Sequence, residues 1–451
     1  MIHSRLAALA GATLAAVTLA ASISAAIPQI PFTDTKLKNG LRVIISENHV
    51  APVFSVAVSY NVGSRDERPG RTGFAHLFEH MMFKGSENVG TGEHFYTIFS
   101  NGGTMNGTTN KERTLYFETM PANQLEAGIF LEADRMRSLA ITKESLDNQR
   151  NAVQEERRSG LDNQPYGHTF EAIDEQAIDN PAYKHSVIGS MTDLNAASVD
   201  DVATFFRTYY APNNAIIAVT GDVTTSRVLE LARKYFEPIP AQAAPPPVDV
   251  TQAPQIAERR LSLDDALARV PRLDISYRIP SNLSADNDSI EVLALILGFG
   301  RSSRFYESIV RQKQLATGAA AFAPNSRGPR LFRISATPIP GKSLEDLEAA
   351  IYAEIERVKT GPIADWEIEK ARNTTRRQFV SGLQSSLNRA VELAESALVY
   401  NNPGEVNTRY ARLDKLTVAD VQRVARQYLT PETRSVVITR LKAAGGGRGG
   451  L

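Results

Sequence analysis

Cysteine is absent from all 451 residues of the chain. Its absence excludes a disulfide framework and a thiol nucleophile, although it does not by itself identify a cellular compartment. Neither sign of charge is in excess, since 50 Lys and Arg residues balance 50 Asp and Glu residues. Basic blocks are missing as well, so nucleic acid and anionic membrane surfaces are poor candidates as partners.

Long apolar runs are missing after the first 26 residues. Arg5 precedes an uncharged, alanine-rich run over residues 6–21, and the small residues 22–26 that follow suit cleavage. This pattern is typical of a secretory signal peptide, here residues 1–26. An uncleaved membrane anchor is the alternative, but a run so rich in Ala and Gly inserts weakly, which favours cleavage. We therefore expect a periplasmic or secreted protein that has no membrane contact once the signal is removed.

The chain contains an internal repeat. A helix-like segment over residues 201–212 is followed by a strand-like segment over residues 215–220, and the same order recurs over residues 420–431 and 435–439. A chain of this length is expected to form two or more domains. The repeat favours two domains of similar structure.

A Pro- and Ala-rich segment over residues 241–256 has no apolar period and is typical of an extended linker. It separates an N-terminal domain, residues 27–240, from a C-terminal domain, residues 257–442. The glycine-rich end, residues 443–451, is expected to be disordered. Alternating strands and long amphipathic helices in both domains predict an α+β fold, with helices packed on a mostly antiparallel sheet.

Two histidines and a glutamate lie within five residues of the apolar stretch Gly73–Gly85. A helix places His76 and His80 on one face, with Glu79 beside them as a candidate general base. Neutral imidazoles suit zinc, and a catalytic zinc needs three protein ligands and one open position. The spacing His-x-x-Glu-His is a catalytic signature. The alternative is an amphipathic helix whose histidines are simply hydrogen bonded, but polar groups on so apolar a helix need partners.

A third ligand is expected on the helix predicted between Thr142 and Gly160. Leu146 and Val153 mark the apolar stripe of this helix. At about 100° per residue, Glu156 falls on the stripe, whereas Glu155 points to the opposite side. An inward carboxylate needs a cation, which is either the metal at the two histidines or one of the two arginines that follow Glu156 directly.

The sequence from Val62 to Gly85, with the run Gly-Phe-Ala-His-Leu-Phe-Glu-His-Met-Met-Phe-Lys-Gly at its end, resembles the pitrilysin-type zinc metallopeptidases, or inverzincins. Similarity extends over nearly all of the chain after the predicted signal, and is to the short two-domain bacterial members and to mitochondrial processing peptidase subunits. The resemblance implies two like domains that form half of a clamshell around a peptide chamber. It also implies one zinc ion per chain, held by His76, His80 and Glu156, with Glu79 activating water.

Three further expectations concern the surroundings of this site. Many members of the family carry a second glutamate two turns before the third ligand, and Gln149 stands at that position here. Its neutral amide still hydrogen-bonds a ligand but removes one negative charge beside the metal. Small residues over 101–109 leave a backbone edge to which a peptide could add as a strand, unless they form an ordinary turn. The resemblance implies that Asn106 and Gly107 hold the substrate main chain.

The second half has no metal motif. At the place that corresponds to the motif, residues 291–297 form an apolar stretch without ligands. The resemblance implies that this domain supplies an Arg and a Tyr to the scissile carbonyl. Arg330 and Arg333 are the candidates for the Arg, whereas no tyrosine follows them before Tyr352.

The sequence therefore predicts a zinc-dependent endopeptidase, a hydrolase that acts on peptides or unfolded polypeptide segments in an enclosed chamber. The alternative is a non-catalytic scaffold or a processing-complex subunit of the same fold. A complete set of metal ligands and base favours the enzyme, because a scaffold has no physical need of them together. The resemblance also implies that two chains meet, either as a homodimer or as a heterodimer with a related metal-free subunit that supplies the missing Arg and Tyr.

Overall fold

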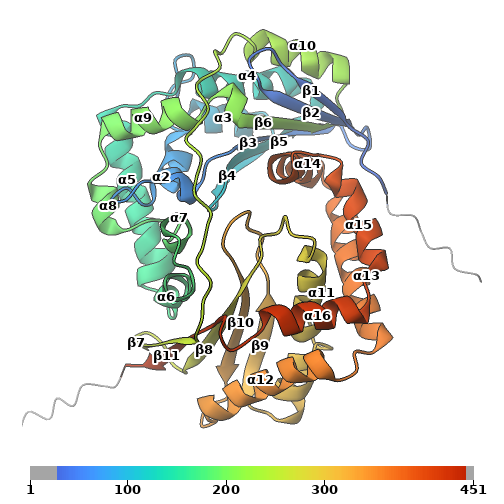
Figure 1. Ribbon diagram of the computed structural model, residues 1–451. Coiled ribbons are helices and arrows are strands. Elements are labelled where there is room, and N and C mark those ends of the chain that lie inside the picture. The colour runs from blue at the N-terminus through green and yellow to red at the C-terminus, as the bar shows by residue number, and fades with distance from the viewer. Residues whose placement is uncertain (1–27, 443–451) are drawn as a thin grey trace, which may run out of the picture.

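The computed structural model describes residues 28–442 (Figure 1). The predicted signal peptide, residues 1–26, and the predicted disordered end, residues 443–451, lie outside the described residues. Two β-sheets with their helices form the two halves of the molecule, one above the other in Figure 1. Within residues 28–442, none of the helices combines the length and the apolar character that crossing a bilayer requires.

The first sheet has six strands in the order β1-β2-β6-β3-β5-β4. Only β2 and β6 pair in parallel, and the other neighbours pair antiparallel. The strands are β1 (Thr33–Lys36), β2 (Arg42–Glu47), β3 (Val53–Tyr60), β4 (Thr104–Thr109), β5 (Thr114–Pro121) and β6 (Ala215–Gly221).

The second sheet has five strands in the order β7-β11-β8-β10-β9, and again one pair, β7 and β11, is parallel. The strands β7, β11, β8, β10 and β9 correspond in order and direction to β2, β6, β3, β5 and β4 of the first sheet. The predicted α+β fold of two like domains with mostly antiparallel sheets is thus confirmed. The strands are β7 (Arg259–Asp265), β8 (Arg272–Ile279), β9 (Ala316–Phe322), β10 (Arg330–Pro338) and β11 (Arg434–Leu441).

Helices account for most of the remaining chain. The α-helices of the first half are α2 (Phe74–Met81), α3 (Glu93–Ser100), α4 (Leu125–Ser138), α5 (Lys143–Arg157), α6 (Gly167–Ala177), α7 (Pro181–Lys184), α8 (Met191–Asn195), α9 (Val199–Tyr209) and α10 (Thr225–Tyr235). Those of the second half are α11 (Asn287–Gly298), α12 (Leu344–Thr360), α13 (Asp365–Gly382), α14 (Ser386–Tyr400), α15 (Glu405–Lys415) and α16 (Val418–Tyr428). Short 3-10 or π segments lie at Ser64–Asp66, Ala122–Gln124, Arg158–Asp162, Pro212–Asn214 and Tyr306–Gln312.

The repeat seen in the sequence corresponds to α9 followed by β6 and to α16 followed by β11. Both helices begin in the same way. The Ser198 hydroxyl accepts a hydrogen bond from the backbone N–H of Asp201 at 3.1 Å, and the Thr417 hydroxyl accepts one from Asp420 at 3.3 Å. Each aspartate bonds back to its capping residue, which forms a capping box in both copies.

The first sheet is buried on both faces. One face carries the larger side chains of alternate residues on β3, such as Phe54, Val56 and Val58, and packs on helices of the first half. The other face carries Ser55 and Ala57, and small side chains there leave room for a helix to approach closely. That helix is α14, which belongs to the second half of the chain.

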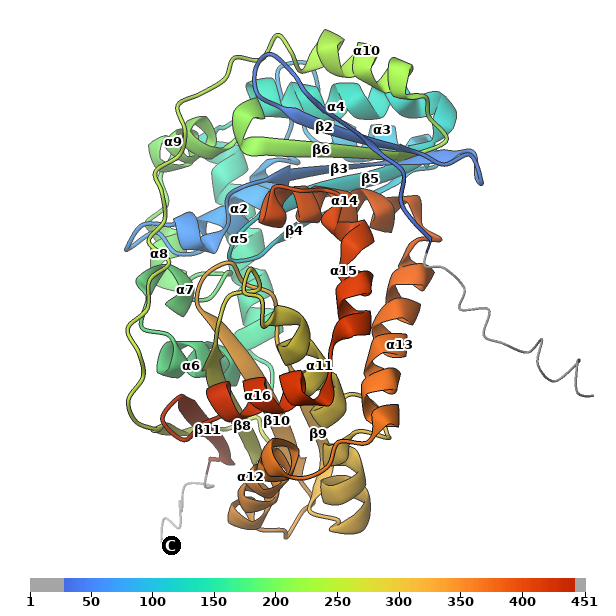
Figure 2. The ribbon, with the colours of Figure 1, turned by 45° about the vertical axis from the view of Figure 1, so that its right-hand side comes forward.

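The two halves therefore exchange helices. α14 packs against β3, β6 and β5 of the first sheet, while α6 of the first half packs against β11, β8 and β7 of the second sheet. Figures 1 and 2 both show α14 lying along the first sheet. Hydrogen-bonded hydroxyl pairs join each helix to the sheet of the other half: Ser55 and Ser386 form a partly buried pair at 2.7 Å, and Thr169 and Thr439 a buried pair at 2.7 Å.

The predicted linker, residues 241–256, contains neither helix nor strand and runs as a strap along the outside of both halves (Figure 1). Its backbone is held in place, since the Asn180 amide donates to the carbonyl oxygens of Asp249 and Thr251 at 2.9 and 2.8 Å. The predicted domain limits at residues 240 and 257 stay predictions. Packing does not follow these limits strictly, since α14 packs on the sheet of the first half and α6 packs on the sheet of the second half.

The helix exchange leads to a prediction about stability. Leu393 on α14 is fully buried in a core cluster that also contains Ala57 and Ala218 of the first sheet. Leu393→Ala should lower the free energy of unfolding by about 2–5 kcal/mol, as for other buried leucines. Unfolding should remain a single transition, because the contact between α14 and the first sheet belongs to both halves. Urea denaturation followed by circular dichroism measures both, with the half-exposed Val380→Ala as control. Two separate transitions in the unsubstituted protein would contradict the coupling.

Candidate metal centre

The helix that carries the two histidines, α2, begins at Phe74 after a left-handed glycine. Gly73 has φ 87°, and a Cβ there would lie 2.6 Å from the carbonyl oxygen of Ile188, so both the backbone angle and the space require glycine. The buried Glu67 carboxylate accepts hydrogen bonds from the N–H groups of Gly73 and Ala75 at 2.9 and 2.8 Å. These bonds satisfy backbone donors that a helix start leaves free.

Residues 188–197, here called the clamp segment, hold the start of α2. The Asp193 carboxylate accepts bonds from the N–H and hydroxyl of Thr72 at 3.0 and 2.5 Å. A Cβ at Gly189 would lie 2.4 Å from the Cα of Gly73, so the two backbones touch.

The clamp segment also holds the helix α5, which carries Glu156. Three side chains spaced three or four residues apart on α5 reach it: Arg150 donates to the carbonyl of Leu194 at 3.0 Å, Gln154 to the side chain of Asn195 at 2.8 Å and Arg157 to the carbonyl of Gly189 at 2.7 Å. The two helices are thus fixed relative to each other through one shared segment, which sets the distance between the histidines and the glutamate.

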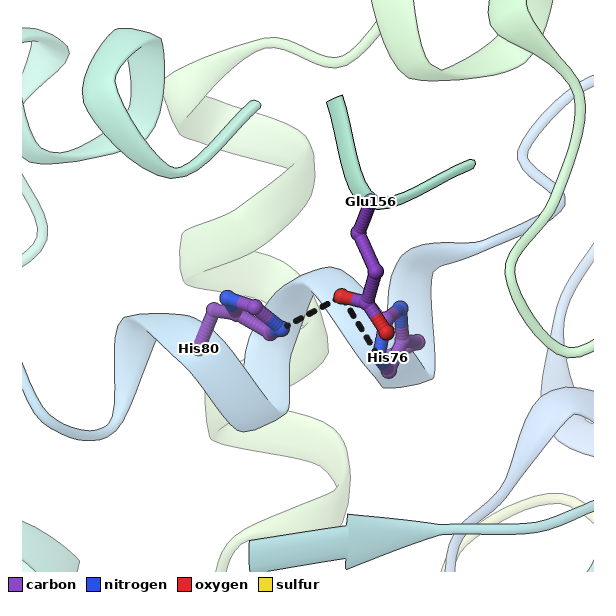
Figure 3. Close-up of side chains that lie close together, drawn as sticks. All are labelled: His76, His80 and Glu156. Atoms are coloured by element: carbon purple, nitrogen blue, oxygen red, sulfur yellow. Dashed lines mark ion pairs between the residues drawn. The ribbon is translucent and has the colours of Figure 1, made fainter. Parts of the chain in front are cut away.

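His76, His80 and Glu156 converge on one point (Figure 3). The Oε2 atom of Glu156 lies 3.6 Å from Nε2 of His76 and 3.3 Å from Nε2 of His80. Donor atoms at about 2.0–2.2 Å from a tetrahedral zinc lie roughly 3.3–3.6 Å from each other. The three residues therefore fit a zinc ion with little movement.

The neighbouring Glu155 points away, as the helical period predicts. Its side chain is 70% exposed and pairs with Arg158 at 3.1 Å, whereas Glu156 faces the histidines. Sequence reasoning therefore chose the glutamate that the structure brings to His76 and His80.

The electrostatics of the three groups suit metal binding. Burial lowers the pKa of His76 to about 4, although the carboxylate of Glu156 opposes this shift, so the imidazole is neutral at pH 7. A hydrogen bond with His80 lowers the pKa of Glu156 below its ordinary value, which keeps the carboxylate charged. Two imidazoles and one carboxylate are a ligand set found in catalytic zinc sites.

Gln149 lies on α5 two turns before Glu156 and is buried. Its amide donates to the side chain of Asn148. The buried Nδ1 atom of His76 has no hydrogen-bond partner among the described residues. The structure thus places Gln149 on the helix of the third ligand, and the expectation that it supports a ligand stays a prediction.

Glu79 lies beside the three converging groups and is largely buried. Its Oε2 atom accepts a hydrogen bond from the Thr109 hydroxyl at 2.5 Å. Burial raises the pKa of the Glu79 carboxyl above its ordinary value, and the bond from Thr109 opposes this effect. A raised pKa brings a carboxylate nearer to the range in which it can take up and return a proton.

The strand β4 runs along Glu79 and forms the edge of the first sheet. A Cβ at Gly107 would lie 2.9 Å from Cγ of Glu79, so glycine gives the carboxylate its room. Asn106 is exposed on the same strand, and its side chain accepts from the N–H of Gly107 at 2.9 Å. Sequence reasoning missed Thr109, although strand alternation from Gly107 places it on the same face.

The two arginines proposed for the scissile carbonyl lie on β10 in the second half. Arg330 is 2% exposed and donates to the carbonyls of Pro324 and Ala323 at 2.7 and 2.9 Å, and to Asn287 at 2.8 Å. Arg333 pairs with Asp174 of α6. Neither is brought into contact with His76, His80 or Glu156, but both line a cavity that also includes Thr109. Their role toward a substrate stays a prediction.

A second group of ligand types, His94, Glu118 and Glu132, lies within the core of the first half. Glu132 pairs with the buried Arg135, whose Nε lies 3.1 Å from Oε2 of the glutamate. All of these side chains are at most 3% exposed, so a substrate has no access to them. This group is therefore no competitor for a catalytic centre.

Known proteins match this chain over most of its length. A family profile described as "Insulinase (Peptidase family M16)" matches residues 42–190, and one described as "Peptidase M16 inactive domain" matches residues 196–375. The chain is 30% identical over 426 residues to the zinc protease PqqE of Helicobacter pylori, across 94% of this chain and 95% of that protein. It is 23% identical over 406 residues to a probable mitochondrial-processing peptidase subunit beta of Arabidopsis thaliana, across 88% and 76%.

A solved structure is similar over the same extent. The crystal structure of a protease from Helicobacter pylori superposes with a TM-score of 0.87 at 30% identity, and the match covers 91% of this chain and all of that one.

The ligand geometry leads to a prediction about metal content. Zinc affinity should fall at least about tenfold in each of Glu156→Ala, His76→Ala and His80→Ala. Loss of a residue that merely supports a metal ligand already costs about tenfold or more, and loss of a ligand itself should cost no less. Glu155→Ala should keep the zinc content of the unsubstituted protein, because its side chain points to solvent. Metal analysis by mass spectrometry after dialysis against zinc measures this. A zinc-free Glu155→Ala protein beside a zinc-replete Glu156→Ala protein would reverse the assignment.

Proposed function

Because this chain belongs to peptidase family M16, the insulinase family, we propose that it is a zinc-dependent endopeptidase that hydrolyses peptides or unfolded polypeptide segments. The proposal is supported above all by the convergence of His76, His80 and Glu156. The Oε2 atom of Glu156 lies 3.6 Å from Nε2 of His76 and 3.3 Å from Nε2 of His80. Those spacings suit three residues that would hold a zinc ion, which in catalytic sites has three protein ligands and a further position for water or substrate.

Glu79 acts as the general base in this proposal. Zinc, when bound, supplies a Lewis acid for the scissile carbonyl and makes a water molecule more acidic. The Glu79 carboxylate would take a proton from the attacking water as the water oxygen bonds to the scissile carbonyl carbon, and would give it to the amine nitrogen as the C–N bond breaks. Thr109 orients the carboxylate through its hydrogen bond to Oε2, and Gly107 leaves space for it.

The edge strand β4 is the proposed site for the substrate main chain. It ends the sheet order, Gly107 lies on it directly beside Glu79, and the exposed Asn106 precedes Gly107 on the same strand. An extended peptide that adds to this edge as a further strand brings its backbone carbonyls past the metal centre without regard to side-chain identity. This mode fits unfolded segments, which expose their backbone, and excludes folded domains.

The second candidate function is that of a non-catalytic scaffold or processing-complex subunit. It is favoured by the second half, where α11 replaces the metal motif with apolar residues and the profile match carries the description "inactive domain". The first half retains both histidines, Glu156 and the base in one geometry, which a scaffold does not need. Turnover of a peptide by the zinc-loaded chain separates the two functions.

We also propose that the protein works in the periplasm or outside the cell and as a pair of chains. The location rests on the signal-like residues 1–26. The pairing rests on the sequence, in which no tyrosine follows Arg330 and Arg333 before Tyr352, and on the similarity to a protein named as a processing-peptidase subunit. A related metal-free subunit would supply the carbonyl-binding groups.

Hydrolysis itself is the first prediction of this proposal. The zinc-loaded chain should cleave a quenched fluorescent peptide, lose activity with a chelator and regain it with zinc. Glu79→Gln should keep zinc but lower kcat/KM at least about a hundredfold, because a neutral amide cannot take a proton. Glu155→Ala is the matched control and should retain activity. Near-normal turnover by zinc-loaded Glu79→Gln would refute the general-base role.

Assembly is the second prediction. The purified, zinc-loaded chain alone should cleave the peptide only slowly, and addition of a related subunit that lacks the metal motif should raise this rate strongly. Light scattering gives the mass of the complex, and the peptide assay gives its rate. Full activity from a monomer or a homodimer would rule out a shared site while leaving the zinc endopeptidase proposal intact.

A further inference from the structure

A cavity of about 270 Å³ lies where the first half meets the second, next to the candidate metal centre. The turn between β4 and β5 forms one wall, with Thr109, Lys111 and Glu112, and the strand β10 forms another, with Arg330 and Arg333. Thr109 links the cavity to the centre, because this residue lines the cavity and its hydroxyl donates to Glu79.

Positive charge exceeds negative charge around this cavity. Lys111 and Arg333 share a single carboxylate, that of Asp174, which lies 2.8 Å from Nζ of Lys111. Glu112 pairs with Arg327 at 3.2 Å. Arg330 bonds only to uncharged acceptors. Four cations against two carboxylates leave an excess of two positive charges.

Part of this charge is unsatisfied. The Nε atom of Arg333 is buried and has no hydrogen-bond partner among the described residues. The Lys111 ammonium group donates to Asp174 and to the carbonyl oxygen of Tyr183, and burial lowers its pKa below the ordinary value while Asp174 opposes the shift. A partly buried guanidinium with a free donor, such as that of Arg333, is stabilised by an anion that enters beside it.

The path from the metal centre to the cavity has the length of a few peptide residues. Gly107 lies against Glu79, and Lys111 follows four residues later along the same hairpin. β4 ends at Thr109 and Lys111 lies in the turn beyond it, so the strand rise of about 3.3 Å per residue applies only as far as Thr109. A peptide that extends β4 at its edge reaches this turn, and with it the cavity, within about three to five residues of the scissile bond.

We propose that this cavity is a subsite for a carboxylate of the peptide substrate, recognised by Lys111 and Arg333, and that it gives the chain a preference for acidic segments. The inference rests on the proposed peptidase function and specifies its substrate class. The carboxylate comes from an Asp or Glu side chain or from the C-terminus of a short peptide, and both present the same anion to the two cations.

Binding to zinc-loaded Glu79→Gln protein tests the subsite without requiring hydrolysis. Fluorescently labelled peptides that carry one Glu at successive positions, each matched by a Gln peptide, are compared by fluorescence anisotropy. A Glu at one position three to five residues from the centre should bind about tenfold more tightly than Gln, the size expected for a hydrogen bond to a charged group. Amidated and free C-termini distinguish a side-chain carboxylate from a terminal one.

Substitutions then identify the residues. In the Glu79→Gln protein, Arg333→Met and Lys111→Met should each abolish most of the Glu-over-Gln preference, and Arg333→Lys should retain it. Arg227→Met, which removes an exposed cation paired with Glu126 on the opposite side of the first sheet, should leave the preference unchanged. Raising the salt concentration to about 0.5 M should weaken the preference in the unsubstituted site as well.

The outcomes separate the two proposals. Equal binding of Glu and Gln peptides at every position, or a preference that survives both Met substitutions, overturns the subsite whatever the catalytic activity. If a Met variant fails to fold, the peptide comparison and its salt dependence in the Glu79→Gln protein still decide. Failure of the zinc-loaded, unsubstituted protein to cleave any peptide, both alone and with a related subunit added, overturns the peptidase function alone, because the binding comparison does not depend on turnover.

Discussion

The backbone contact between Gly73 and Gly189 is the constraint on which the metal centre depends. A side chain on either residue would collide with the other segment, at 2.4 Å in the case of Gly189. Because the contact is so close, the clamp segment can hold Thr72 at the start of α2 and Arg157 at the end of α5 at the same time. The ligands therefore lie on two rigid helices joined by one short bridge, and their spacing is established before a metal arrives.

The sequence predicts much of this centre because its signals are local. The spacing of His76 and His80 depends only on the helical period, and the choice of Glu156 over Glu155 depends on the same period. The clamp segment left no such signal. Its bonds join residues about 120 positions apart in the sequence at Thr72 and Asp193, and no periodic pattern encodes a contact between two glycine backbones.

The internal repeat predicted two like sheets, and the strand orders agree with it. It could not predict which sheet each helix covers. An amphipathic helix such as α14 shows that it buries one face, but the pattern is the same for either sheet. Arg330 illustrates the same limit in the candidate site, because its guanidinium is bonded by the carbonyls of Ala323 and Pro324, and only the path of that loop decides whether the side chain meets backbone or ligand.

The exchange of α6 and α14 also bears on how such a chain can change over evolutionary time. The repeat has the form expected of a duplicated unit, yet each copy now covers a sheet face of the other. Deletion of either copy would leave a sheet of small buried residues such as Ala57 open to water and to edge-on or face-on association with other chains. Neither copy can therefore be deleted without exposing a sheet face of the other, and the copy without the metal motif is indispensable to the copy that carries it.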